Sequence, residues 1–112
     1  MESDRMNDNT VDWLKRHCFK LNRKEDAYIR WTPINTIMLS ARQEKISDKW
    51  IIEAFVDYEG KDYVFALIVP EVNDRTFTEF AWRYNKEVKK QPFHWLSNYY
   101  LEFDERISVI VN

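Results

Sequence analysis

Apolar residues near the start of the chain recur every three or four positions, the spacing of a helix with one buried side. The positions concerned are Val11, Leu14, Cys18 and Leu21. Asn9 or Thr10 can cap such a helix, because their side chains accept hydrogen bonds from its first N–H groups. The spacing predicts a helix over residues 10–22, with residues 1–8 as a flexible N-terminus and residues 9–112 as one domain.

Farther along the chain, apolar and polar residues alternate, which is typical of strands. The segments with this pattern are 27–33, 36–42, 50–58 and 63–69. One side of segment 50–58 carries Trp50, Ile52, Ala54, Val56 and Tyr58. The other side carries Ile51, Glu53, Phe55 and Asp57.

Gly60 is the only glycine of the chain and lies between the last two of these segments. A glycine there suits a turn that needs a positive φ, such as a type I turn closed by a glycine bulge. We therefore expect segments 50–58 and 63–69 to pair as an antiparallel hairpin. Segment 63–69, YVFALIV, is apolar on both sides, a pattern typical of a central strand that is covered by helices or by another subunit.

A second helical pattern follows the hairpin. Thr76 and Glu79 match a capping box, and the apolar residues around them share one helical stripe. That stripe consists of Phe77, Phe80, Ala81, Tyr84 and Val88. The pattern predicts a helix over residues 75–89, and alternation in 99–103 and 107–111 predicts a final hairpin.

These elements follow one another in the order α-β-β-β-β-α-β-β. We expect an α+β domain whose antiparallel sheet is a four-stranded meander plus a C-terminal hairpin, with both helices packed on one face. The order of elements resembles that of the small acidic secretion chaperones, although the C-terminal helix typical of that class is missing. The resemblance adds a chaperone-like dimer to the functions to be weighed.

Composition limits the size of the domain, the classes of partner and the compartment that we expect. Hydrophobic residues make up 45% and aromatic residues 16% of the 112 positions, which is enough for the core of one domain. Seventeen basic and 19 acidic residues leave a formal net charge of -2, so no overall field attracts nucleic acid or an anionic membrane. A single cysteine can form no internal disulfide, and no apolar run is long enough to span a membrane. We expect a cytoplasmic protein.

The chain lacks the residues that several kinds of catalytic or cofactor site need. Phosphate-cradling loops need glycines, so the Walker, Rossmann and kinase types are excluded. The only candidates for metal ligands of nitrogen or sulfur are His17, Cys18 and His94, and Cys18 fits the buried side of the first helix better than a zinc site. Glu53 and Asp57 could act as paired carboxylates, but the solvated side of a half-exposed strand is the simpler interpretation. We expect no enzyme, no cofactor and no metal.

Basic and aromatic residues gather on the side of the second helix away from its apolar stripe. They are Trp82, Arg83, Lys86 and Lys90, with Trp95 shortly after the helix. Tryptophan and arginine often anchor protein interfaces, and basic groups beside aromatic rings can hold single-stranded nucleic acid. The simpler alternative is a solvated face on which Glu79 pairs with Arg83. If the helix is followed by a sharp turn at Pro92, Trp95 can return beside Trp82.

On the sheet, Ile51 and Phe55 are a second candidate for a binding surface. If both helices cover the opposite face, these two side chains are exposed among charges, which suggests a partner surface or a dimer. The alternative is that the first helix or the final hairpin covers them.

The hypothesis that these observations favour is a small protein that binds and occupies a surface of another protein. Immunity proteins, antitoxins and phage-encoded inhibitors of bacterial defence act in this way, and the partner would be a protein such as a nuclease or a defence protein. The alternatives are a chaperone-like dimer and a small enzyme with a site assembled from scattered residues. A nucleic-acid-binding module is disfavoured by the net charge.

Overall fold

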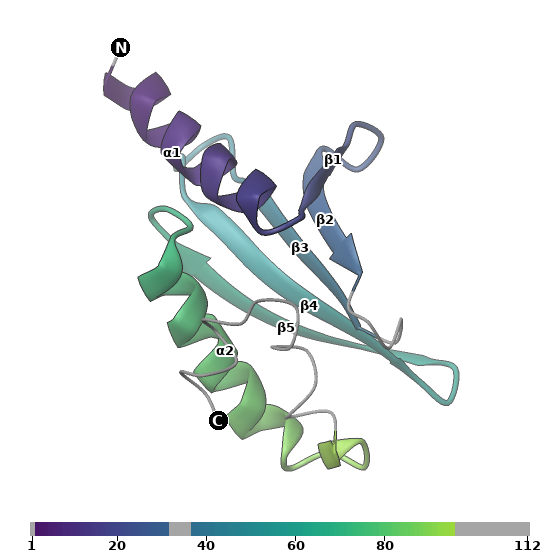
Figure 1. Cartoon of the computed structure of the whole chain (residues 1–112). Coiled ribbons are helices and arrows are strands. Elements are labelled where there is room, and N and C mark those ends of the chain that lie inside the picture. The colour runs from purple at the N-terminus through teal and green to yellow at the C-terminus, as the bar shows by residue number, and fades with distance from the viewer. Residues whose placement is uncertain (1, 32–36, 96–112) are drawn as a thin grey trace.

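The computed structural model of the chain describes residues 2–31 and 37–95, while residues 32–36 and 96–112 lie outside the description (Figure 1). The elements are α1 (Glu2–Arg16), β1 (Lys20–Asn22), β2 (Ala27–Trp31), β3 (Ile37–Gln43), β4 (Trp50–Tyr58), β5 (Lys61–Val69) and α2 (Asp74–Val88). The strands form one antiparallel sheet in the order β1-β2-β3-β4-β5. The α+β class is therefore confirmed.

The number of strands differs from the prediction. Five strands precede α2, where four were expected, because the chain forms β1 in place of the last turns of the predicted first helix. The predicted final hairpin of 99–103 and 107–111 lies outside the described residues. Neither of the two described helices is long and apolar enough to cross a membrane.

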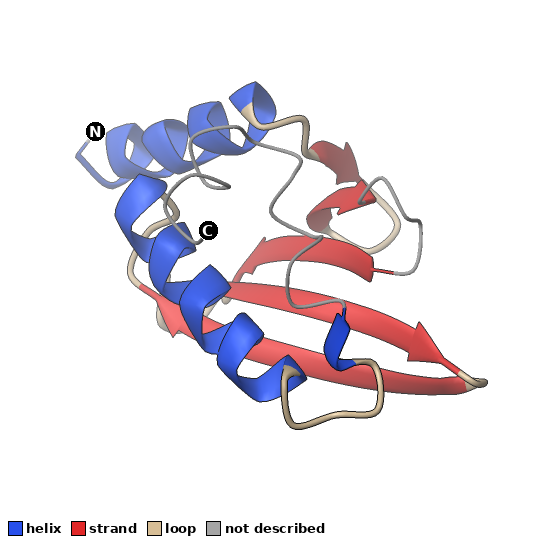
Figure 2. Cartoon of the chain, turned by 60° about the horizontal axis from the view of Figure 1, so that its bottom comes forward, coloured by secondary structure: helices blue, strands red, loops and turns tan. Residues whose placement is uncertain are grey.

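Both helices lie on the same side of the sheet, as Figures 1 and 2 show. The core fills the space between them and that side, which we call the covered face. Its sheet residues include Ile37, Leu39, Ala41, Trp50, Ile52, Ala54, Val56 and Val69, and its helix residues include Trp13, Leu14, Phe77, Phe80, Tyr84 and Val88. The predicted alternation along β4 and the predicted stripe of α2 are thus both buried as expected.

The first helix begins and ends earlier than predicted. It starts at Glu2, and the residues before the expected start contain no glycine or proline to prevent this. It ends because Cys18 has left-handed backbone, with φ of 67°, which lets the Phe19 N–H reach the Leu14 carbonyl oxygen at 2.9 Å. This is a Schellman cap, with both hydrophobic partners, Phe19 and Leu14, in the core. The chain then leaves the helix axis and forms β1.

Hydrogen bonds fix α1 to the segment that begins α2. Trp13 Nε1 donates to Asp74 Oδ1 at 2.7 Å, and the Val72 N–H donates to the buried Thr10 Oγ1 at 3.1 Å. The buried His17 ring stacks on Trp13 at 3.8 Å between centroids, and its Nδ1 donates to the Trp13 carbonyl oxygen at 2.8 Å. The two helices are therefore joined directly as well as through the core.

The hairpin between β4 and β5 lies where it was predicted but has a different turn. Glu59 and Gly60 form a two-residue loop, and both have positive φ, 52° and 77°. That is the type I′ geometry, which matches the twist of the strands better than a type I turn does. The turn pairs Tyr58 with Lys61 and so sets the register of the whole hairpin.

The second helix begins with a reciprocal cap. Asn73 Oδ1 accepts from the Thr76 N–H, and Thr76 Oγ1 accepts from the Asn73 N–H, both at 2.9 Å. The prediction that Thr76 caps the helix together with Glu79 is therefore wrong, because Thr76 is the third helical residue and Asn73 is the N-cap.

Candidate protein-binding surfaces

One side of the sheet is turned away from both helices, and we call it the open face (Figure 2). Large apolar side chains are exposed on it. It consists of the outward side chains of β2 to β5: Ala27, Ile29, Trp31, Met38, Ser40, Arg42, Ile51, Glu53, Phe55, Asp57, Asp62, Val64, Ala66 and Ile68. Trp31, Val64 and Ile68 are 57%, 50% and 61% exposed. The predicted residues Ile51 and Phe55 belong to this face and are half-buried between their neighbours.

The pairing register makes the apolar side chains of the open face contiguous. Trp31, Met38, Phe55 and Val64 stand in one row across four strands. Ile51 and Ile68 pair with each other four residues farther along the hairpin, with Ala66 between Ile68 and Val64 on the same side. A contiguous exposed apolar patch of this kind is typical of an interaction surface.

An ion pair lies among these apolar residues. Arg42 Nε donates to Glu53 Oε1 at 3.2 Å, and the Glu53 side chain is only 14% exposed. A carboxylate so little exposed depends on its cation, so Glu53 has a structural role in the sheet. Asp57 lies opposite Asp62 in the hairpin and is exposed, as the simpler interpretation expected, whereas Glu53 is mostly covered.

The open face is hollowed on one side. A cavity of about 730 Å³ lies over β1 to β4, and its lining includes Ile29, Trp31, Met38, Ser40 and Phe55. Val64 and Ile68 project from the neighbouring β5, which is the edge strand of the sheet among the described residues. The prediction that segment 63–69 is a central strand stays a prediction, because the segments 99–103 and 107–111 lie outside the described residues. Neither described helix covers its outward apolar residues.

The outer side of α2 carries a second exposed set, Trp82, Arg83, Lys86 and Lys90, which we call the α2 surface. Trp82 is 59% exposed, and Lys86 Nζ lies 4.9 Å from the centroid of its ring, a cation–π contact. Arg83 Nη2 lies 3.0 Å from Glu79 Oε2, as predicted. Lys90 Nζ lies 3.5 Å from Glu87 Oε1. Trp82, Arg83 and Lys86 lie on the side of α2 away from its buried stripe, and Lys90 follows in the turn after the helix.

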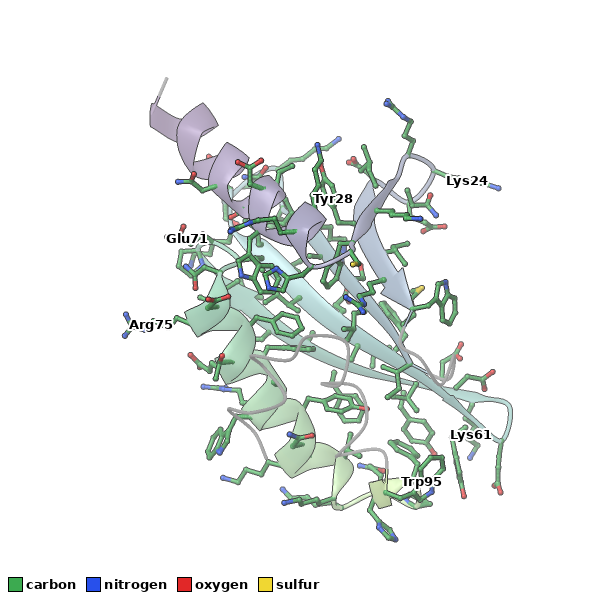
Figure 3. All side chains as sticks on the ribbon, in the orientation of Figure 1. Lys24, Tyr28, Lys61, Glu71, Arg75 and Trp95 are labelled. Atoms are coloured by element: carbon green, nitrogen blue, oxygen red, sulfur yellow. The ribbon has the colours of Figure 1, made fainter. Side chains whose placement is uncertain are left out.

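Trp95 lies apart from the outward side of α2. Phe93, which is buried, packs against Tyr58 and Tyr63 with ring centroids 5.3 and 4.7 Å apart, and this contact draws the chain toward the β4–β5 hairpin. Figure 3 shows Trp95 at that end of the molecule, on the side where Lys61 lies. The turn after α2 therefore carries Trp95 away from the helix, and the expected return to Trp82 is not observed.

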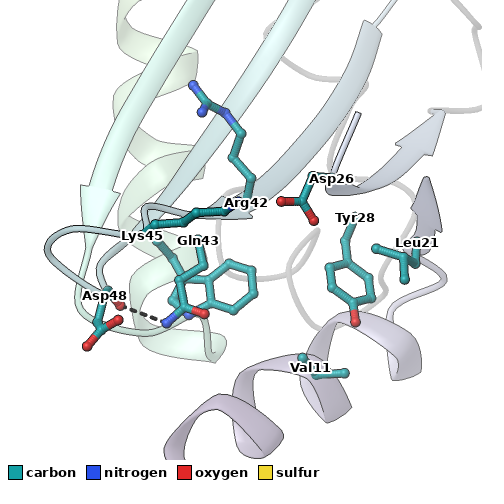
Figure 4. A pocket seen from close by; sticks show the side chains of 9 residues that line it. Val11, Leu21, Asp26, Tyr28, Arg42, Gln43, Lys45 and Asp48 are labelled. Carbon is teal, nitrogen blue, oxygen red and sulfur yellow. Dashed lines mark hydrogen bonds between the residues drawn. The ribbon is translucent and has the colours of Figure 1, made fainter. Parts of the chain in front are cut away.

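A smaller hollow of about 450 Å³ lies beside the second half of α1 (Figure 4). Val11, Tyr28 and Trp50 form its apolar part, and Asp26, Lys45 and Asp48 contribute charges from two turns. These charged side chains are exposed, and none of the residues that line the hollow contributes a buried polar atom without a hydrogen-bond partner. The hollow has the volume of a small-molecule site but not the converging polar groups.

The residues considered for chemistry lie apart and have other roles. His17 is buried and stacked on Trp13, whereas Cys18 is exposed at the end of α1. The prediction that Cys18 belongs to the core is wrong, because its left-handed backbone turns it out of the helical stripe. His94 is exposed beyond α2. The described residues contain no group of three or more histidine, cysteine or acidic side chains that could hold a metal ion.

Sequence reasoning missed the three large apolar residues that are exposed on the open face, Trp31, Val64 and Ile68. The signal was present in YVFALIV, whose outward side is as apolar as its inward side, but it was assigned to a central strand. Trp31 lies on β2, where alternation alone does not show which side the helices cover. Comparison of the chain with protein-family models, curated proteins and solved structures found no match, so function is inferred from the surfaces themselves.

Proposed function

We propose that this protein is a small cytoplasmic binding protein that occupies a surface of another protein, and that the α2 surface makes the contact. The observation that carries the proposal is the position of Trp82, which is more than half exposed in the middle of a helix whose opposite side is buried in the core. An exposed indole on a rigid helix is the kind of group that anchors protein interfaces.

The neighbours of Trp82 restrict the motion of its side chain before a partner binds. Lys86 holds one face of the indole, so less side-chain freedom is lost when a partner takes up the other face. Arg83, the next residue in the helix, is held by Glu79 one turn away. The helix itself is fixed by its N-cap and by the hydrogen bond from Trp13 to Asp74. The α2 surface is therefore preorganised.

Charge indicates which partner fits the α2 surface. Between residues 74 and 90, five basic residues stand against three acidic ones, although the whole chain has a net charge of -2. The partner surface expected is an apolar pocket that accepts an indole, with acidic groups at its rim. Inhibitors of this kind bind proteins such as nucleases and other defence proteins, and we extend that class of partner to this chain.

The test compares two tryptophans with nearly equal exposure on opposite sides of the molecule. The native partner is first captured with the tagged wild-type protein in its own host and then purified. Its affinity is measured for the wild type, for Trp82→Ala with Arg83→Ala, and for the control Trp31→Ala. We expect the double variant to bind about 30-fold more weakly, equivalent to about 2 kcal/mol, and the control to bind like the wild type.

Two results would contradict the proposal. One is unchanged affinity of the folded double variant, with folding checked by a circular dichroism melt. The other is that the same two residues bind single-stranded DNA or RNA oligonucleotides, with an affinity that falls steeply with salt. That second result would assign the α2 surface to nucleic acid.

A further inference from the structure

We propose that the open face is an interface between two copies of this chain, which pack face to face as a two-fold symmetric dimer. The proposal concerns a surface on the opposite side of the sheet from α2 and does not depend on the proposed function. Its starting point is the row Trp31, Met38, Phe55 and Val64, whose two outermost members are at least half exposed.

The charges of the open face favour a second copy over a charged partner. Arg42 and Glu53, the charged residues that lie among the apolar ones, form an ion pair with each other. Asp57 and Asp62 also point outward, but they lie at the edge of the patch, beside the β4–β5 turn. The apolar part of the surface is therefore neutral, so that part of one copy does not repel the same part of another. An isologous interface has to meet this condition because each residue patch faces its own equivalent across the two-fold axis.

The shape of the open face is complementary to itself. The hollow over β1 to β4 lies on one side, and Val64 and Ile68 project from β5 on the other. A two-fold axis running parallel to the strands places β5 of one copy over β2 of its partner. Val64 then meets Trp31 and Met38 of the other copy, and each β5 ridge fills the other hollow.

The area of the sheet is sufficient for such a dimer. Its strands contain 3, 5, 7, 9 and 9 residues, and at about 3.3 Å per residue and about 4.8 Å between strands they cover about 500 Å². Two copies together offer about 1,000 Å² before side-chain relief is counted, which is the size at which specific interfaces begin. Packed sheets of this kind lie about 10 Å apart.

Such a dimer leaves both α2 surfaces outside. Each open face is covered, and each helix layer lies on the outer side of its own sheet (Figure 2). A dimer of this protein would therefore present two α2 surfaces facing in opposite directions.

The first experiment measures mass in solution. We expect the wild type to be a dimer by analytical ultracentrifugation, and Val64→Lys to raise the dimer dissociation constant at least 100-fold, because the lysine enters an apolar contact. Ile46→Lys is the matched control: Ile46 lies in the β3–β4 turn outside the open face and is 96% exposed, so this variant should remain a dimer. A wild type that stays monomeric at about 100 µM, or a Val64→Lys variant that stays dimeric, would overturn the proposal.

A second experiment tests the orientation and does not require a destabilised variant. In a Cys18→Ser background, Val64→Cys combined with Trp31→Cys should give a covalent dimer with a short bifunctional thiol reagent that spans about 10 Å, the separation of packed sheets. The two positions lie three strands apart within one chain, about 14 Å, which is too far for such a reagent to link them internally. Ile46→Cys combined with Trp31→Cys is the control and should give none. Equal cross-linking of both pairs, or none in the first, would exclude this arrangement.

Discussion

The two faces of the sheet use the same strands for different purposes. Along β4, Ile52 and Ala54 point to the covered face and are fully buried, whereas Ile51 and Phe55 point to the open face and are half-buried. Both faces are largely apolar, but in the part of the chain that the structure describes the helices lie over the covered face alone. The apolar side of a strand does not by itself show what covers it. That depends on where the helices pack, which the pattern of a single strand does not contain.

The comparison separates side chains that stabilise the isolated domain from side chains that are available to a partner. Burial on the covered face supplies the hydrophobic free energy that holds the domain together. The open face contributes less to the isolated chain, because its side chains remain partly in water. Changes on the two faces should consequently differ in what they affect, and the following predictions use neighbouring or similar residues to test this.

The largest difference is expected between two adjacent isoleucines of β4. Ile52→Ala should lower the free energy of unfolding by about 3 kcal/mol, because it leaves a cavity in a closed core. Ile51→Ala removes the same atoms from the open face and should cost the monomer about 1 kcal/mol or less. Urea titration of both variants, made in the Val64→Lys background to keep the chain monomeric, measures the difference. Equal losses would mean that both faces are covered.

A smaller effect is expected at the β4–β5 turn. This turn fixes the register of the hairpin and so determines which side chains point to each face. Gly60→Val should destabilise the domain by about 1 kcal/mol or more, because φ of 77° is strained for valine although no atom lies near its Cβ position. Glu59→Gly is the matched control: it relieves a positive φ of 52° in the same loop and should be neutral or stabilising. A wild-type melting temperature for Gly60→Val would contradict the turn geometry.

Much of the fold follows from the sequence, and the misses have identifiable causes. The β4–β5 hairpin and the buried stripe of α2 were predictable because period and turn chemistry agree there. The end of α1 was not, because the Schellman cap depends on a cysteine in left-handed backbone, which residue preferences do not anticipate. The type I′ turn was missed for a similar reason, since it places a glutamate at positive φ.

The candidate surfaces were predictable to different degrees. The outward position of Trp82 and Arg83 follows from helical spacing, once the opposite stripe is known to be buried. The extent of the open face does not, because it depends on which edge of the sheet β5 occupies and on where both helices pack. Trp31 joins Val64 in one row only through the pairing of four strands, a long-range arrangement that no local pattern contains.

Alkaline pH gives a third test of the covered face. Tyr84 is buried beneath α2 against Phe65, and burial raises the pKa of its phenol above the ordinary value of about 10. The unfolded chain therefore loses this proton first, so the full stability holds below pH 10 and falls as pH rises toward the higher pKa of the folded state. The loss should reach about 1 kcal/mol near pH 11 and should be absent in Tyr84→Phe. Parallel urea titrations at pH 8 and pH 11 measure it. An equal alkaline loss in both proteins would assign it to other groups.

The smallest effect on the fold is expected at the two exposed tryptophans, and it distinguishes the open face from the α2 surface. Trp31→Ala and Trp82→Ala should each change the unfolding free energy of the monomer by about 0.5 kcal/mol or less, since neither indole fills the core. A dimer, however, is stabilised by mass action, so its melting temperature rises with protein concentration. We expect the wild type and Trp82→Ala to show this rise over a 100-fold range of concentration, and Trp31→Ala to lose it. If Trp82→Ala abolished the rise and Trp31→Ala kept it, the α2 surface would be the interface between copies, and the open face would be left for the other partner.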